Sequence, residues 1–122
     1  MVDDLSPEEV EIAVKETRLL LVEAWSPSCG PCKDLGPILE DLEDTYAKNS
    51  DLRIVKINTH DHIGFASKNN IFALPCVLGF FEGKPARYVC QDSGGDARVV
   101  DRLIGLRPMD HYDDMICSLL DI

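Results

Sequence analysis

The chain has 122 residues, 45% of them hydrophobic and 28% charged, a composition typical of globular proteins and unlike that of disordered or fibrous chains. The length suits one domain, and we expect residues 1–122 to fold as a single unit. Lys and Arg number 12 against 22 Asp and Glu, so the formal net charge of -10 disfavours binding to nucleic acid or to an anionic membrane surface.

The sequence also bears on the cellular compartment. Its first five residues have neither the basic nor the apolar segment of an export signal. The uncharged stretch from Ile71 to Phe81 is shorter than the roughly 20 apolar residues that cross a bilayer. Five cysteines are an odd number, and only Cys29 and Cys32 are close in sequence, which is unlike a disulfide-stapled secreted scaffold. We therefore expect a cytoplasmic protein without a transmembrane segment.

The first residues predict a helix followed by a buried strand. Ser6, with Pro7 and two glutamates after it, is a helix start, and apolar residues at helical spacing carry this helix to about Arg18. The run Leu19–Trp25 is apolar except for Glu23, a pattern typical of a central strand covered on both faces. We expect this acid to be buried, and a solvent-facing position at the strand end is the alternative.

A second helix and a second strand follow. Apolar residues from Leu35 onward recur at helical spacing to about Asn49, and Pro37 is expected to kink this helix. Leu52–Asn58 predicts the next strand, and a helix between two such strands indicates a parallel βαβ unit. A short helix is expected over Ile63–Lys68.

The last third of the chain predicts a hairpin and two helices. Cys76–Phe81, a Glu-Gly turn and residues 86–90 form the expected hairpin, which makes the sheet mixed. For residues 97–104 the apolar spacing favours a helix, with a strand over residues 99–104 as the alternative. Residues 108–120 place apolar side chains on one face and predict a closing helix.

Cys29 and Cys32 form a Cys-x-x-Cys motif at the predicted junction of a strand and a helix. A single pair of this kind indicates a redox couple, with an inert or metal-binding pair as the alternative. Free backbone N–H groups and the helix dipole at a helix start favour the thiolate of Cys29, which is the expected nucleophile. Cys32 lies one turn further on, within disulfide reach, and is expected to resolve a mixed disulfide.

The segment from Trp25 to Lys33, with Gly30 and Pro31 between its cysteines, resembles the active-site segment of thioredoxins. The similarity covers roughly residues 8–90 and implies the α/β thioredoxin fold, with a mixed central sheet of about four strands and helices on both faces. The chain starts directly at the first helix, so we expect the family's first edge strand to be missing. Residues 91–103 exceed the family pattern and predict an extended C-terminal region.

The resemblance also implies roles for single residues. Glu23 stands where the family has a buried acid that assists deprotonation of Cys32, and Lys56 is a nearby cation that tunes the pair. For Lys56, a position at the sheet edge with the ammonium group reaching water is the alternative. A cis peptide bond before Pro75 would leave the Leu74 backbone free to pair with a substrate strand. The implied substrate-binding residues are Trp25, Gly30, Pro31, Leu74 and Pro75.

Two positions depart from the family pattern. Ser28 stands where thioredoxins usually have an aromatic residue before the first cysteine, and Cys76 stands where they have threonine after the cis-proline. We expect Cys76, Cys90 and Cys117 to pack as small hydrophobic side chains. The histidines at 60 and 62 are expected at a solvated helix start and not in a metal site.

These features predict a protein disulfide reductase that acts on disulfide-containing proteins through a mixed disulfide at Cys29. The resemblance implies that a thioredoxin reductase or a similar electron donor reduces it again, and neither a cofactor nor a metal is expected. The alternative is an interaction module of the same fold that docks a partner or binds a metal through Cys29, Cys32 and Cys76 without turnover.

Overall fold

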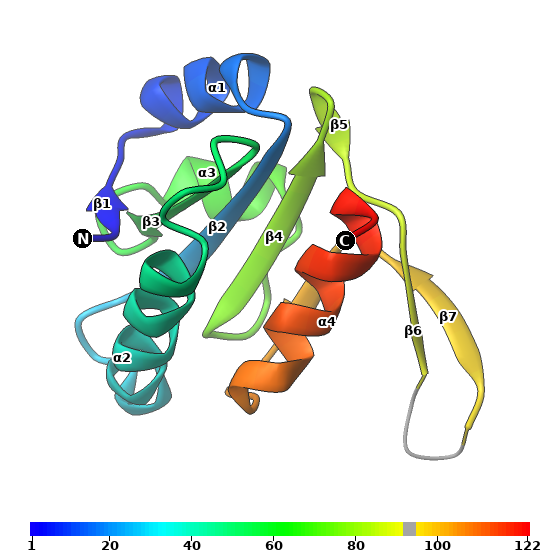
Figure 1. Ribbon diagram of the computed structural model, residues 1–122. Helices are drawn as coiled ribbons and strands as arrows, with labels where there is room; N and C mark the ends of the chain where they lie inside the picture. The colour runs from blue at the N-terminus through cyan, green and yellow to red at the C-terminus, as the bar shows by residue number, and fades with distance from the viewer. Residues whose placement is uncertain (92–94) are drawn as a thin grey trace.

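A mixed β-sheet forms the centre of the computed structural model, which describes residues 1–91 and 95–122 (Figure 1). The strand order is β1-β3-β2-β4-β5, and β8 pairs with β4 along the same edge as β5. Strand β2 is parallel to β3 and antiparallel to β4, which confirms the predicted mixed sheet. The strands of this sheet are β1 (Asp3–Asp4), β2 (Leu19–Trp25), β3 (Leu52–Asn58), β4 (Cys76–Phe81), β5 (Lys84–Pro85) and β8 (Arg102–Ile104).

Helices cover both faces of the sheet, as predicted (Figure 1). Alternate residues of β2 point to opposite faces, and because every one of them from 19 to 24 is buried, this strand needs cover on both sides. Helices α2 and α4 pack on the Leu19 and Leu21 side, and helices α1 and α3 on the Leu20 and Val22 side. The helices are α1 (Pro7–Glu16), α2 (Gly30–Thr45), α3 (Ile63–Lys68) and α4 (Met109–Leu120).

The edge strand that we expected to be missing is present as β1. Asp3 and Asp4 pair in parallel with Val55 and Lys56 of β3, and the N–H of Leu5 donates to the carbonyl of Lys56 at 2.8 Å. Two polar residues carry no apolar alternation, so the pattern gave no signal for this strand. Among the described residues the sheet therefore has six strands, three of them only two or three residues long, and not about four.

The predicted hairpin is correct at its turn but wrong in its second strand. Only Lys84–Pro85 (β5) pairs with β4, whereas Tyr88–Gln91 (β6) pairs with Ala97–Val100 (β7) in a separate two-stranded sheet. Strand β6 does not reach β4 because β8 takes up the remaining edge of that strand, pairing with residues 76–78. Strands β6 and β7 extend from the body of the protein as a hairpin-like arm (Figure 1).

The helix expected over residues 97–104 is wrong, and the alternative of a strand is nearer to the structure. This stretch forms β7 and β8, which are separated by Asp101. Its β-branched residues favour a strand, and β8 completes the open edge of β4 with Leu103 buried against the α4 side. Residues 92–94, within the expected insertion, lie outside the described part of the chain. The closing helix is confirmed as α4.

Candidate active site

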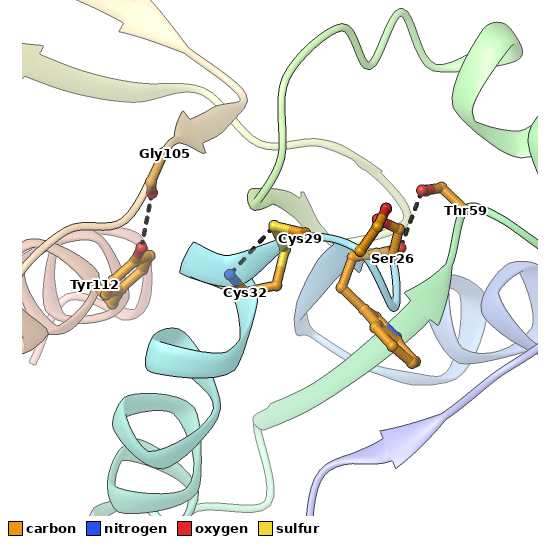
Figure 2. The surroundings of a disulfide bond; sticks show 8 residues. Ser26, Cys29, Cys32, Thr59, Gly105 and Tyr112 are labelled. Atoms are coloured by element: carbon orange, nitrogen blue, oxygen red, sulfur yellow. Dashed lines mark hydrogen bonds between the residues drawn. A yellow bond between two sulfur atoms is a disulfide. The ribbon is translucent and has the colours of Figure 1, made fainter.

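Cys29 and Cys32 are joined in a disulfide at the start of α2 (Figure 2). Cys29 is the N-cap residue of this helix, and its sulfur accepts a hydrogen bond from the backbone N–H of Cys32 at 3.2 Å. Cys29 is partly exposed, whereas Cys32 is buried with 6% of its surface accessible. A partner molecule can therefore reach the sulfur of Cys29 more readily than that of Cys32.

The local sequence places the pair at the helix start. Strand β2 ends at Trp25, and a turn follows in which the N–H of Cys29 donates to the carbonyl of Ser26 at 3.1 Å. Pro31 lies in the first turn of α2, where its fixed φ suits the helix and its missing N–H leaves no bond unmade. No acidic residue lies in this first turn, so the helix dipole acts on Cys29 without a nearby opposing carboxylate from α2.

The peptide bond between Leu74 and Pro75 is cis, as the resemblance implied. It lies at the same end of the sheet as the dithiol, because Ala24 at the end of β2 pairs with Cys76 at the start of β4. The N–H of Gly105, just after β8, donates to the carbonyl of Pro75 at 2.8 Å. The ends of β2, β4 and β8 therefore meet around this site.

Gly105 is fixed in turn by α4. The hydroxyl of Tyr112 donates to the carbonyl of Gly105 at 3.3 Å, and Figure 2 shows this pair on one side of the disulfide. On the other side, the hydroxyl of Thr59 donates to the carbonyl of Trp25 at 2.9 Å. These supporting contacts had no sequence signal, because they join residues that are far apart in the chain.

A cavity of about 330 Å³ lies behind the disulfide, and Glu23, Cys32 and Lys56 are among the residues that line it. Glu23 is buried, with 3% of its surface accessible, as predicted, and one of its carboxylate oxygens has no hydrogen-bond partner among the described residues. Burial raises the pKa of Glu23 to about 7, against an opposing effect of the Lys56 ammonium, while Asp4 raises the pKa further. Glu23 can therefore exchange a proton near neutral pH.

Lys56 lies next to Glu23 because the two residues are register partners on the parallel strands β2 and β3. Its ammonium group is 5.3 Å from the centre of the Trp25 ring, a cation–π contact. The indole N–H of Trp25 donates to a carboxylate oxygen of Asp4 at 3.2 Å. Asp4 is a residue of the site that the sequence analysis missed, because it belongs to the unrecognised strand β1.

The remaining cysteines, Cys76, Cys90 and Cys117, are in no disulfide. Cys76 is buried, and burial raises the pKa of its thiol although the Arg102 guanidinium partly opposes the shift. Cys90 and Cys117 line a different cavity, between β6 and α4, and the sulfur of Cys117 lies 3.3 Å from the hydroxyl oxygen of Tyr46. In residues 1–91 and 95–122, no three His, Cys, Asp or Glu side chains gather closely enough to hold a metal ion.

The arrangement defines a class of chemistry, thiol–disulfide exchange by a dithiol. Cys29 is accessible and Cys32 buried, the pair closes a disulfide, and a titratable carboxyl group shares a cavity with the buried cysteine. In the described part of the chain, nothing supports the alternative of a metal-binding interaction module. None of the described helices has the length and apolar character needed to cross a bilayer.

Comparisons with known proteins agree with this class. The sequence model of the thioredoxin family matches residues 2–101, and the chain belongs to this family. It is 27% identical over 101 residues to thioredoxin from Staphylococcus aureus, covering 83% of this chain and 82% of the relative. The chain is accordingly a thiol–disulfide oxidoreductase that acts on disulfide substrates.

Solved structures of thioredoxins have the same fold. A mutant thioredoxin from Halobacterium salinarum superimposes with a TM-score of 0.76 at 21% identity, covering 99% of this chain and 91% of that one. Thioredoxin from Plasmodium falciparum gives a TM-score of 0.74 at 21% identity, covering 96% and 98%. The superposition over nearly the whole chain shows that the C-terminal region, including α4, belongs to the same fold.

Proposed function

We propose that the protein reduces disulfides in other proteins in two exchange steps that begin at Cys29. The Cys29 thiolate attacks one substrate sulfur, forming a mixed disulfide and releasing the other substrate sulfur as a thiolate. Cys32 then attacks the sulfur of Cys29, which frees the reduced substrate and leaves the Cys29–Cys32 disulfide. Two electrons pass from the dithiol to the substrate. The observation that carries this proposal is the disulfide at the start of α2, with Cys29 as its accessible member.

Glu23 is the proton acceptor for Cys32 in this scheme. Both residues line the same cavity, and a carboxyl group with a pKa of about 7 can be ionised and protonated within a narrow pH range. Accepting the proton of Cys32 generates the thiolate that resolves the mixed disulfide. Lys56 tunes this step, because its charge favours the ionised form of Glu23.

The substrate strand lies across the end of the sheet where the dithiol and the cis-proline are found. There the backbone of Leu74, which precedes the cis-proline, pairs with an extended segment of the substrate. The remaining contacts come from the turn around the dithiol, namely Trp25, Gly30 and Pro31. Support for this placement comes from the pairing of β2 with β4, which puts the two segments at one end of the sheet.

A thioredoxin reductase or a similar donor regenerates the dithiol, as family membership suggests. The proposed compartment is the cytoplasm. Three cysteines outside the Cys29–Cys32 disulfide, namely Cys76, Cys90 and Cys117, support this compartment, since a reducing environment keeps cysteines from forming unwanted disulfides.

The direct test is the reduction of insulin by dithiothreitol with and without a catalytic amount of the protein. We expect the protein to accelerate insulin reduction in proportion to its concentration. A rate that stays at the level of dithiothreitol alone would rule out the proposed reductase activity.

Cys76 is expected to take no part in turnover, because its buried thiol has a raised pKa and stays protonated. Cys76→Thr should leave the rate of insulin reduction within about twofold of the native rate, since threonine is similar in size to cysteine. Mass spectrometry of the oxidised native protein should find one disulfide, between Cys29 and Cys32. A disulfide that includes Cys76, or zinc or iron that is lost in the threonine variant, would instead support a third reactive or ligating cysteine.

A further inference from the structure

A groove with basic walls runs along the β5, β7 and β8 side of the protein, outside the dithiol site. Its volume is about 680 Å³. The whole chain has 12 Lys and Arg against 22 Asp and Glu, yet five basic residues and one acidic residue, Asp101, line this groove. The basic residues are Lys84, Arg87, Arg98, Arg102 and Arg107.

Two of these side chains are tied to the fold. Arg102 pairs with Asp101 at 2.7 Å and donates to the carbonyl of Asn69, also at 2.7 Å, which links β8 to the end of α3. The Nε of Arg107 donates to the carbonyl of Ile104 at 3.1 Å. Arg102 and Arg107 therefore stabilise the fold and also line the groove.

The other three basic residues that line the groove form no ion pair within the described part of the chain. They are Lys84, Arg87 and Arg98, and all three are exposed. Two large apolar side chains line the same groove, Val99 with 54% and Ile104 with 53% of their surface accessible. Three available cations next to exposed apolar side chains are suited to a ligand that combines negative charge with apolar groups.

We propose that this groove binds an acidic, partly apolar segment of the protein whose disulfide is reduced. The argument is charge complementarity. The chain as a whole is strongly acidic, but basic residues are concentrated along this groove. They attract an acidic segment that the rest of the surface repels. The proposal that the groove selects substrates rests on the proposed reductase function. The proposal that the groove binds an acidic segment does not depend on that function.

The groove leads toward the dithiol end of the sheet. Ile104, which lines it, is the register partner of Cys76, the residue after Pro75. The next residue, Gly105, donates its N–H to the carbonyl of Pro75. A partner segment held in the groove therefore lies along the sheet edge that ends at the cis-proline, which favours presentation of a neighbouring disulfide to Cys29.

A polypeptide suits this groove better than a nucleic acid. The net charge of -10 repels a long polyanion, whose closely spaced phosphates extend far beyond five basic residues. Val99 and Ile104 also offer contacts to apolar side chains, which a phosphate backbone lacks. A short acidic segment avoids most of the repulsion and uses both kinds of contact.

Binding is tested by fluorescence anisotropy with a labelled, cysteine-free peptide that alternates Asp and Glu with Leu and Val. A matched peptide replaces the acids with Asn and Gln, and a single-stranded oligonucleotide of equal charge serves as a third probe. We expect the acidic peptide to bind more tightly than the neutral one, with an affinity that falls as salt is added. The double variant Arg87→Glu/Arg98→Glu should raise the Kd for the acidic peptide by about tenfold.

The control is Lys15→Glu/Lys48→Glu, which changes the net charge equally at two exposed residues that do not line the groove. It should change the Kd by less than about twofold. Equal binding of the acidic and neutral peptides, no binding of either, or equal loss in both double variants would overturn the proposal. Groove-dependent binding of the oligonucleotide as tight as that of the peptide would also overturn it.

Kinetic measurements with disulfide peptides distinguish substrate selection by the groove from the reductase function itself. A disulfide peptide that carries the acidic segment should show a KM about tenfold higher with Arg87→Glu/Arg98→Glu than with the native protein, at an unchanged kcat. If the acidic and neutral disulfide peptides are reduced equally well, the groove does not select substrates although the reductase function stands. If neither peptide is reduced, the reductase function fails, and the binding experiment alone decides on the groove.

Discussion

Replacing Cys29 with serine is expected to abolish catalysed disulfide reduction, lowering the rate by more than about 100-fold to that of the chemical dithiol alone. A serine hydroxyl at the start of α2 can still cap the helix, so the fold should be retained. It cannot open a substrate disulfide, because an alcohol is a far weaker nucleophile than a thiolate. Initial rates of insulin reduction, compared at equal protein concentration, give the measurement.

Cys90→Ser is the matched control, since it makes the same chemical change at a cysteine that lines another cavity. Its rate should stay within about twofold of the native rate. A Cys29→Ser variant that remains folded and retains catalytic activity would show that another residue opens the disulfide.

Glu23→Gln is expected to stabilise the protein increasingly as the pH rises. The pKa of Glu23 is about 7 in the folded protein and 4.5 for an ordinary glutamate, so the folded state binds the proton more tightly than the unfolded chain. Ionisation of Glu23 therefore lowers the free energy of unfolding progressively between pH 4.5 and 7, and the loss is constant above that range. Glutamine does not ionise and escapes this loss.

The difference in unfolding free energy between the glutamine variant and the native protein should grow by on the order of 2 kcal/mol from about pH 5 to about pH 8. Urea denaturation of the oxidised proteins across this range gives the values. Glu16→Gln makes the same substitution at an exposed position at the end of α1 and is the control against which the values for Glu23→Gln are compared. A pH-independent difference for Glu23→Gln would mean that Glu23 remains ionised, or solvated, in the folded protein.

The same substitution should slow the second exchange step, because it removes the carboxyl group that we propose as the proton acceptor for Cys32. We expect the rate at which the mixed disulfide is resolved to fall by about 10- to 100-fold near neutral pH, while attack by Cys29 is retained. Stopped-flow measurement of Trp25 fluorescence, from the only tryptophan in the chain, can follow both steps.

The sequence predicted the dithiol site because its signals are local. A strand, two cysteines three residues apart and a helix start are adjacent in the chain, so no long-range pairing is needed to place them. Glu23 is similar, since an acid within an apolar strand indicates burial by itself. For Lys56 the sequence left two positions open, near the dithiol or at the sheet edge. The register of β2 with β3, which places Lys56 opposite Glu23, decides between them.

Elements fixed by tertiary pairing could not be predicted. Strand β1 has two polar residues and exists because β3 has an open edge, and Asp4 reaches Trp25 only through that pairing. Strand β8 has helical apolar spacing in the sequence, but pairing with β4 overrides it. The basic groove is lined by residues of β5, β7 and β8. Only the packing of these strands determines which basic side chains lie close together.

The most direct test of the proposed mechanism is to trap the intermediate on Cys32→Ser. This variant keeps the Cys29 thiol but cannot resolve a mixed disulfide, so incubation with a disulfide-containing protein should give a covalent, dithiothreitol-sensitive adduct. Peptide mapping by mass spectrometry should find the substrate cysteine linked to Cys29. Absence of an adduct, or an adduct linked to Cys76, Cys90 or Cys117, would contradict the assignment of Cys29 as the nucleophile.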